Sequence, residues 1–199
     1  MNNSDFLVFC DVETSGVSFA GNDPSFDPFK RERFSIVSLA AVITDRSFRV
    51  IDEFYSLSKF DSSIFTWQIK AQQIHGLSIS FLAKEGVEQW KLADDFNHFL
   101  LKNSIDTSRA IHFVGHNFRG FDFYFIDFLM GRFSKPLKFA GRCFDSNSLC
   151  LLTGTNDSTE LFEKLGISRE QPHNALSDCK ATIEAFKKMT KKYGKLQIL

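Results

Sequence analysis

The chain contains a short apolar run that leads directly into two acidic residues. Residues 6–10 are all apolar, and Asp11 and Glu13 follow at alternate positions. Such a run is typical of a strand that is buried on both faces of a sheet. Because alternate side chains of a strand share a face, Asp11 and Glu13 are expected to point the same way. Two adjacent carboxylates repel each other, so the pair either binds a divalent cation or lies in solvent at the strand end.

The order of apolar and polar segments predicts an α/β protein. Residues 6–14, 34–44 and 48–57 are expected to form an antiparallel meander, and two further strands are expected at residues 109–115 and 138–143. Helical spacing of apolar residues and helix-boundary residues predict helices at residues 64–74, 78–84, 87–101, 121–130, 145–152, 159–165 and 174–192. Three strands followed by alternating helices and strands are typical of a mixed five-stranded sheet flanked by helices.

The composition is that of an ordinary globular protein. The chain has 199 residues, of which 43% are hydrophobic and 24% are charged, so residues 1–199 are expected to form one domain. The segment at about residues 17–33 is rich in Gly, Asn, Asp, Ser and Pro and is expected to be a long loop insertion beside the acidic pair. The 24 basic and 24 acidic residues give a net charge of zero. This balance argues against a protein that holds duplex nucleic acid mainly through its phosphates.

Cysteine usage and hydropathy predict where the protein resides. The four cysteines are scattered and form no Cys-x-x-Cys pair, which indicates neither a zinc site nor a disulfide framework. The first residues carry no basic or apolar leader, and no apolar run approaches the roughly 20 residues that cross a bilayer. We therefore expect a cytoplasmic protein without a membrane partner.

Two more acidic residues and one histidine occur at helix starts. Asp122 follows a glycine-containing turn, where it either binds a cation or stabilises the first turn of a helix. Asp178 lies near the start of the last helix, and His173 precedes it by five positions. A histidine in such a place is commonly a capping or surface residue. Beside otherwise unexplained acids it is also a candidate general base.

Three segments, in this order, resemble the motifs of the DEDDh exonucleases of the DnaQ-like superfamily. They are FCDVETSG at residues 9–16, Asp122 at the end of GHNFRGFD (residues 115–122), and HNALSDCKAT at residues 173–182. The run IHGLS at residues 74–78 also resembles the His-Gly-Ile segment of that family. The resemblance extends over roughly residues 5–190. It implies a ribonuclease H-like fold and a 3′–5′ exonuclease that releases nucleoside 5′-monophosphates from the 3′ end of a single strand.

The resemblance also implies the residues of the site. The catalytic residues would be Asp11, Glu13, Asp122, Asp178 and His173. The four acids would bind two Mg²⁺ or Mn²⁺ ions, and the histidine would act as the general base. The terminal nucleotide would be bound by Thr14, Ser15, Gly16, His75 and Asn117.

The substrate and the partners stay open at this point. One residue more separates Asn117 from Asp122 than in proofreading subunits, and the insertion at residues 17–33 is longer than in compact members. Single-stranded DNA is favoured, and an RNA-trimming or oligoribonuclease-like enzyme is the alternative. A non-catalytic module that binds nucleic-acid ends and a structure-selective endonuclease are the remaining alternatives. A homodimer or a polymerase partner is compatible with the sequence.

Overall fold

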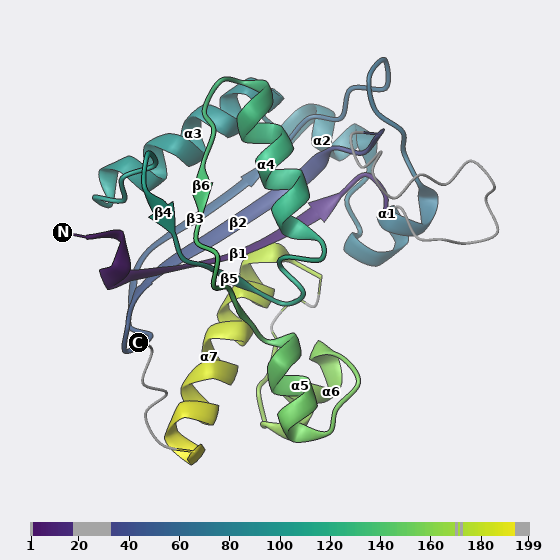
Figure 1. Cartoon of the computed structure of the whole chain (residues 1–199). Helices are drawn as coiled ribbons and strands as arrows, with labels where there is room; N and C mark the ends of the chain where they lie inside the picture. Colours follow the sequence, from purple (N-terminus) through teal and green to yellow (C-terminus); the bar gives the residue numbers. More distant parts are fainter. Residues whose placement is uncertain (1, 18–32, 170, 172, 194–199) are drawn as a thin grey trace.

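A five-stranded sheet runs through the centre of the computed structural model, which describes residues 2–17, 33–169, 171 and 173–193 (Figure 1). The strand order is β3-β2-β1-β5-β7. The antiparallel part is formed by β1 (Phe6–Thr14), β2 (Ile36–Asp45) and β3 (Val50–Leu57). On the other side of β1, β5 (Phe113–Gly115) and then β7 (Phe144–Asp145) pair in parallel. The predicted mixed five-stranded sheet is confirmed.

Seven α-helices lie within the described residues, and six of them lie close to their predicted positions, whereas the helix predicted at residues 64–74 begins only at Ile69. They are α1 (Ile69–His75), α2 (Ile79–Glu85), α3 (Gln89–Lys102), α4 (Asp122–Arg132), α5 (Asn147–Thr153), α6 (Ser158–Lys164) and α7 (Ala175–Tyr193). A 3₁₀ turn, Asn3–Asp5, precedes β1. Gly76 ends α1 in the left-handed conformation with φ of 73°, as its position after a helical segment predicts. Ser78 begins α2 by accepting a hydrogen bond from the backbone N–H of Phe81.

The side chains of β1 alternate between two hydrophobic cores. Val8 and Cys10 belong to the core that the sheet forms with α3 and α4. Leu7 and Phe9 belong to the core that it forms with α5, α6 and α7 on the opposite face (Figure 1). The same alternation continues to the end of β1 and places the odd-numbered Asp11 and Glu13 on the α7 face. The register of one central strand thus decides which helices the two acids meet.

The sequence prediction is wrong at the edge of the sheet beyond β1. The strand predicted at residues 109–115 is split at His112 into β4 (Ala110–Ile111) and β5, and β4 pairs with β6 (Lys138–Phe139) in a separate two-stranded sheet. The fifth strand of the main sheet is β7 and not the segment 138–143. It includes Asp145, where the sequence predicts the start of a helix. Strands of two residues are too short for a period of two to show in the sequence.

The predicted loop insertion at residues 17–33 falls largely on residues 18–32, which lie outside the described part of the chain. Among the described residues, no helix is long and apolar enough to cross a membrane.

Candidate active site

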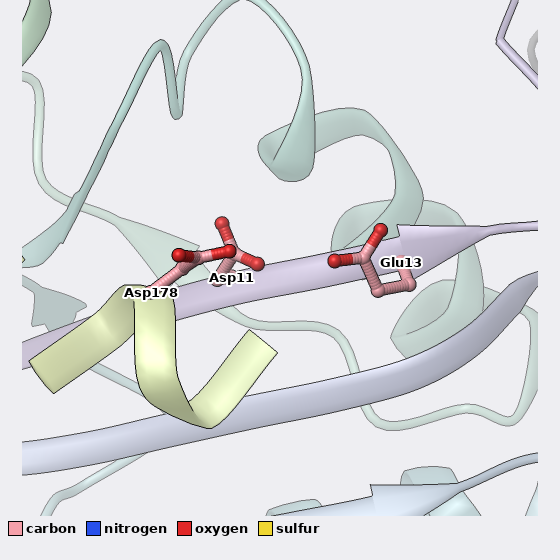
Figure 2. A group of neighbouring side chains, drawn as sticks. All are labelled: Asp11, Glu13 and Asp178. Atoms are coloured by element: carbon pink, nitrogen blue, oxygen red, sulfur yellow. The ribbon is translucent and has the colours of Figure 1, made fainter. Parts of the chain in front are cut away.

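Three carboxylates meet at the end of β1. Asp11 and Glu13 rise from the same side of the strand, and Asp178 reaches toward them from the first turn of α7 (Figure 2). One ligand oxygen from each residue can be chosen so that all three lie within 4.8 Å of one another. Helix α7 is held on this face by its buried residues Cys179, Ile183 and Phe186. The core contacts of α7 and β1 therefore fix the relative positions of the three acids.

Asp122 lies beside this cluster and is tied to the strand itself. It is the first residue of α4, only 2% of it is exposed, and its Oδ1 accepts a hydrogen bond of 3.0 Å from the backbone N–H of Val12. The alternative that Asp122 merely stabilises a helix start does not account for this bond, which joins α4 to the centre of the sheet. Asp122 is not one of the three acids that lie within 4.8 Å, but it lines the same pocket as they do.

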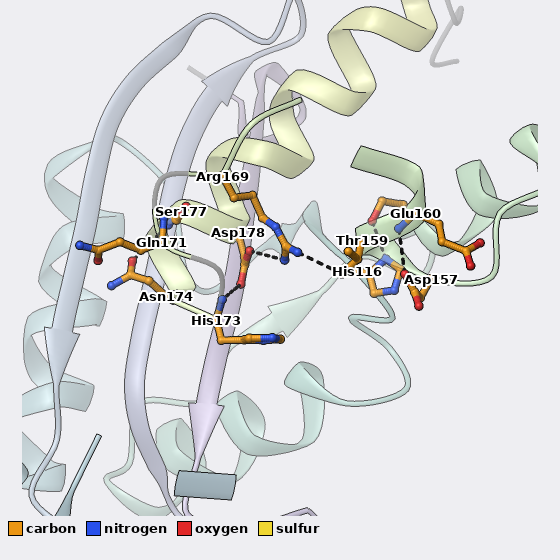
Figure 3. A network of polar contacts seen from close by, with 11 residues as sticks. His116, Asp157, Thr159, Glu160, Arg169, Gln171, His173, Asn174, Ser177 and Asp178 are labelled. Atoms are coloured by element: carbon orange, nitrogen blue, oxygen red, sulfur yellow. Dashed lines mark hydrogen bonds and ion pairs between the residues drawn. The ribbon is translucent and has the colours of Figure 1, made fainter. Parts of the chain in front are cut away.

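The segment before α7 contributes a histidine and an arginine to the surroundings of the acids. The backbone N–H of His173 donates to Oδ2 of Asp178 over 3.1 Å, and Nη1 of Arg169 donates to Oδ1 over 3.1 Å (Figure 3). The side chain of His173 is not used in this contact, and His173 is exposed. Both oxygens of Asp178 are thus held, while the imidazole of His173 stays available at the edge of the pocket.

One pocket collects all five predicted catalytic residues. It has a volume of about 180 Å³, and its lining includes Asp11, Glu13, Asp122, His173 and Asp178. These residues come from β1, α4, the turn before α7, and α7 itself. Residues that are up to 167 positions apart, from Asp11 to Asp178, are therefore brought together by the fold.

A second, larger pocket of about 510 Å³ adjoins the first. Both pockets are lined by Val12, Glu13, His116, Phe121 and His173, so they share one wall. The larger pocket also has an apolar side, formed by Val17, Ala71, Ile74 and Phe125. Its volume lies in the range of small-molecule sites, which is about 300–1,000 Å³.

The five predicted nucleotide-binding residues divide into two groups. Thr14, His75 and Asn117 line the larger pocket, whereas Ser15 and Gly16 are buried and do not. The hydroxyl of Ser15 donates to the backbone oxygen of Thr66, and it accepts from the N–H of Ser35.

Gly16 and Thr14 are also constrained by their local contacts. A Cβ at Gly16 would lie 2.4 Å from the ring of Phe34, so this position requires glycine. The hydroxyl of Thr14 is used within the chain as well, since it donates to the backbone oxygen of Gly16. Ser15 and Gly16 are therefore buried structural residues of the turn after β1 and do not line the larger pocket.

Burial raises the pKa values of all four acids, and mutual repulsion adds to the shift at Asp11 and Glu13. The pKa of Glu13 is raised to about 8 by burial and by the charges of Asp178 and Asp122. Burial raises the pKa of Asp122 to about 7, against the opposing effect of the hydrogen bond from Val12. The pKa of Asp11 is raised well above its ordinary value by burial, with the charges of Asp122, Glu13 and Asp178 adding to the effect. Without a bound cation this cluster is therefore unfavourable when it is fully ionised.

The pKa of Asp178 is also raised by burial, but the hydrogen bond and the charge of Arg169 oppose the shift. The charge of Arg169 likewise opposes the increase in the pKa of Asp11. Arg169 thus offsets part of the repulsion within the acidic pocket.

Arg169, His116 and Phe121 line the smaller pocket, and the sequence did not identify them as site residues. Nδ1 of His116 lies 3.0 Å from the hydroxyl of Ser146, which fixes the orientation of the ring. Phe121 directly precedes α4. The position of His116 next to Asn117 is a signal that could have pointed to it, whereas Arg169 belongs to no motif.

The donor set fits a hard divalent cation. Carboxylate oxygens are the ligands that Mg²⁺ and Mn²⁺ prefer, and the clustered oxygens of Asp11, Glu13 and Asp178 offer three of them. A cation would also offset the repulsion that, after burial, raises the pKa values of Asp11 and Glu13.

Comparison with known proteins is consistent with this geometry. A family model described as an exonuclease, RNase_T, matches residues 8–186. A comparison with curated protein sequences gives no match.

Several solved structures share the fold. The zinc-bound complex of exonuclease I from Escherichia coli with single-stranded DNA has a TM-score of 0.73 and 20% identity, covering 95% of this chain and 41% of that one. The E. coli enzyme with a dT13 oligonucleotide has a TM-score of 0.72 and 20% identity, covering 94% and 41%. For exonuclease I from Methylocaldum szegediense the TM-score is 0.71 at 18% identity, covering 94% and 41%. This chain thus spans about two fifths of the length of these proteins.

Proposed function

The chain belongs to the RNase_T exonuclease family, and we propose that it is a 3′–5′ exonuclease that releases nucleoside 5′-monophosphates from single-stranded DNA. The observation that carries this proposal is the smaller pocket, in which Asp11, Glu13, Asp122, Asp178 and His173 meet. Four carboxylates and one histidine around a single pocket suit the hydrolysis of a phosphodiester with bound cations.

The four acids would hold two Mg²⁺ or Mn²⁺ ions. Asp11, Glu13 and Asp178 supply the clustered oxygens, and Asp122 supplies a carboxylate at the neighbouring wall of the pocket. When bound, the ions would lower the pKa of water and stabilise the charge that develops on the phosphate. The chain itself fixes the ligand positions through β1, α4 and α7, so that little reorganisation is needed when the substrate arrives.

His173 would take a proton from the attacking water. Its imidazole is exposed at the rim shared by both pockets, whereas its backbone is tied to Asp178. The water oxygen forms a bond to phosphorus, and the bond from phosphorus to the 3′ oxygen of the penultimate nucleotide breaks. The departing 3′ oxygen receives a proton from solvent. A positioned base of this kind typically contributes about 10²–10⁴-fold to the rate.

The larger pocket would receive the terminal nucleotide. Ile74 and Phe125 offer an apolar wall for a base, and His75 and Asn117 offer polar atoms. Single-stranded DNA is the favoured substrate because the chain carries no net charge with which to hold a duplex. The structurally similar exonuclease I has been solved with single-stranded DNA and with dT13, which supports the same preference.

The test is digestion of linear oligonucleotides of one sequence, as DNA or RNA and labelled at either end, together with a circular single strand. Mg²⁺, Mn²⁺ and EDTA are compared, and Asp11→Asn serves as the matched inactive control. We expect labelled mononucleotide at once from the 3′-labelled DNA, a shortening ladder from the 5′-labelled DNA, and no product with EDTA. The circle should stay intact.

Each alternative function predicts a different result in this experiment. Cleavage of the circle would indicate an endonuclease, and faster digestion of RNA would indicate the RNA-trimming or oligoribonuclease-like alternative. Binding of 3′ ends without cleavage would indicate a non-catalytic module. The cytoplasmic location, the single domain and a homodimer or polymerase partner remain predictions from the sequence.

A further inference from the structure

Arg169 joins α6 to the acidic pocket. Its Nη1 donates to Oδ1 of Asp178 over 3.1 Å, and its Nη2 donates to the hydroxyl of Thr159 in α6 over 3.0 Å (Figure 3). The guanidinium carbon lies 5.3 Å from the centre of the Phe162 ring, also in α6. Only 11% of the Arg169 side chain is exposed. The guanidinium is therefore fixed from three sides, which is the setting in which arginine and lysine are not interchangeable.

Asp178 transmits this constraint to His173. While Arg169 occupies Oδ1, the backbone N–H of His173 occupies Oδ2. His173 has a φ of 60°, a left-handed conformation that is unfavourable for a residue other than glycine and persists only where the surroundings enforce it. The hydrogen bond to Asp178 is one such constraint. A single carboxylate thus connects α6, through Arg169, to the turn that carries the candidate base.

We propose that Arg169 is a positioning residue that holds Asp178 in the orientation needed to bind the metal and, through Asp178, orders the turn of His173. This inference rests on the proposed function, because it assigns Asp178 and His173 the roles given above. Partners that orient a metal ligand from behind typically contribute about 10–100-fold to metal affinity or activity.

Positioning and simple charge balance predict opposite changes in metal affinity. Arg169 is a cation next to an acidic cluster that binds cations. If it only balanced charge, its removal would make the pocket more negative and the metal would bind more tightly. If it positions Asp178, its removal frees the carboxylate and the metal binds more weakly. The sign of the change therefore separates the two roles.

The experiment measures Mn²⁺ affinity by calorimetry on the full chain without nucleic acid. Arg169→Gln removes the charge and the planar guanidinium fork, and Arg169→Lys keeps the charge and one donor nitrogen but not the fork. Lys180→Gln is the control, because Lys180 lies in α7 two residues after Asp178 but pairs with Glu53 instead. Thermal unfolding in EDTA checks that each variant is folded.

We expect Arg169→Gln to bind Mn²⁺ about 10–100-fold more weakly than the wild type, Arg169→Lys to recover part of this loss, and Lys180→Gln to show no change. Equal or tighter binding by Arg169→Gln would overturn the inference. The KM for the oligonucleotide should change less than kcat, because Arg169 does not line the larger pocket.

Thr159→Ala is a milder variant that decides the question if Arg169→Gln does not fold. Thr159 is exposed and its hydroxyl contacts Nη2 of Arg169, so its loss loosens the guanidinium without disturbing a core. A few-fold weaker Mn²⁺ affinity is expected, and an unchanged affinity would contradict the inference.

The two proposals fail in different ways. A wild-type protein that binds Mn²⁺ but digests no oligonucleotide would contradict the proposed function, whereas the affinity comparison would still test Arg169. A wild type that digests DNA, beside an Arg169→Gln variant with undiminished Mn²⁺ affinity, would contradict only the role of Arg169.

Discussion

The backbone N–H of Val12 donates a hydrogen bond of 3.0 Å to Oδ1 of Asp122, and this bond joins the centre of β1 to the first residue of α4. Asp122 is therefore more than a candidate metal ligand. It also satisfies a backbone donor that is buried between Asp11 and Glu13. Substitutions of Asp122 should affect both activity and stability, and the two effects can be separated.

The first prediction compares Asp122→Asn with Asp122→Ala. Both remove the charge and should lower exonuclease activity at least 100-fold, about the size of a lost catalytic group. Only asparagine keeps an acceptor for the N–H of Val12. Leaving that donor unpaired costs about 1–3 kcal/mol, so Asp122→Ala should be less stable than Asp122→Asn by this amount. Urea unfolding in EDTA measures the difference, and equal stabilities would mean that the hydrogen bond contributes nothing.

The second prediction concerns Asp11, which has no comparable backbone contact among the described residues. Asp11→Asn removes one of the repelling charges, so we expect a higher melting temperature than for the wild type in EDTA. With saturating Mg²⁺ the order should reverse, because the wild type is stabilised by the bound cation and the variant has lost a ligand. Paired melting curves with EDTA and with Mg²⁺ provide the check. A variant that remains the more stable protein in Mg²⁺ would count against Asp11 as a ligand.

The third prediction is a pH dependence that originates at Glu13, whose pKa is raised to about 8. Between the ordinary glutamate pKa and this value, the folded protein binds a proton that the unfolded chain does not bind. The contribution of Glu13 to stability is thus fully present at low pH and is lost as the pH rises toward about 8. Glu13→Gln has no such proton to lose.

The measurement is the free energy of unfolding of Glu13→Gln and of the wild type in EDTA, from about pH 5 to about pH 9. We expect the advantage of the variant to grow with pH and to level off above about pH 8. A constant difference across this range would show that Glu13 is ionised normally in the folded protein.

The fourth prediction separates proton transfer from metal binding at His173. Asparagine tolerates positive φ better than most residues, and the bond to Asp178 uses a backbone N–H that every residue but proline provides. His173→Asn should therefore keep the turn and the Mn²⁺ affinity while kcat falls by about 10²–10⁴-fold. His98→Asn, on exposed α3 surface, is the matched control and should retain full activity. Loss of Mn²⁺ affinity in His173→Asn would make His173 a ligand instead of a base.

Most of the central architecture could be predicted from the sequence because its signals are local. The apolar run of β1 is long enough to show burial on both faces, and alternation alone places Asp11 and Glu13 together. The apolar stripe of α7 likewise predicts which side of that helix is buried, since Cys179, Ile183 and Phe186 are all within the core.

Features that depend on contacts between residues far apart in the sequence could not be predicted. Phe144 and Asp145 become a strand only because β5 lies beside them, and two residues show no period. Arg169 has no local pattern, because its partners are a hydroxyl ten residues before it and a carboxylate nine residues after it. The bond between Val12 and Asp122 spans 110 residues and follows from the docking of α4 on the sheet.

Because β1 alternates between two cores, the face on which Asp11 and Glu13 lie depends on the number of residues that separate them from Leu7 and Phe9. Leu7 and Phe9 hold one face of the strand against α7, and Asp11 and Glu13 share that face because they are an even number of residues away. Cys10 is the residue between Phe9 and Asp11. Its deletion, with Leu7 and Phe9 still packed against α7, would turn both acids toward α3 and α4, away from Asp178. A single-residue insertion or deletion between Phe9 and Asp11 is thus expected to separate both acids from Asp178, whereas substitutions among apolar residues at the core positions of β1 are compatible with the same site.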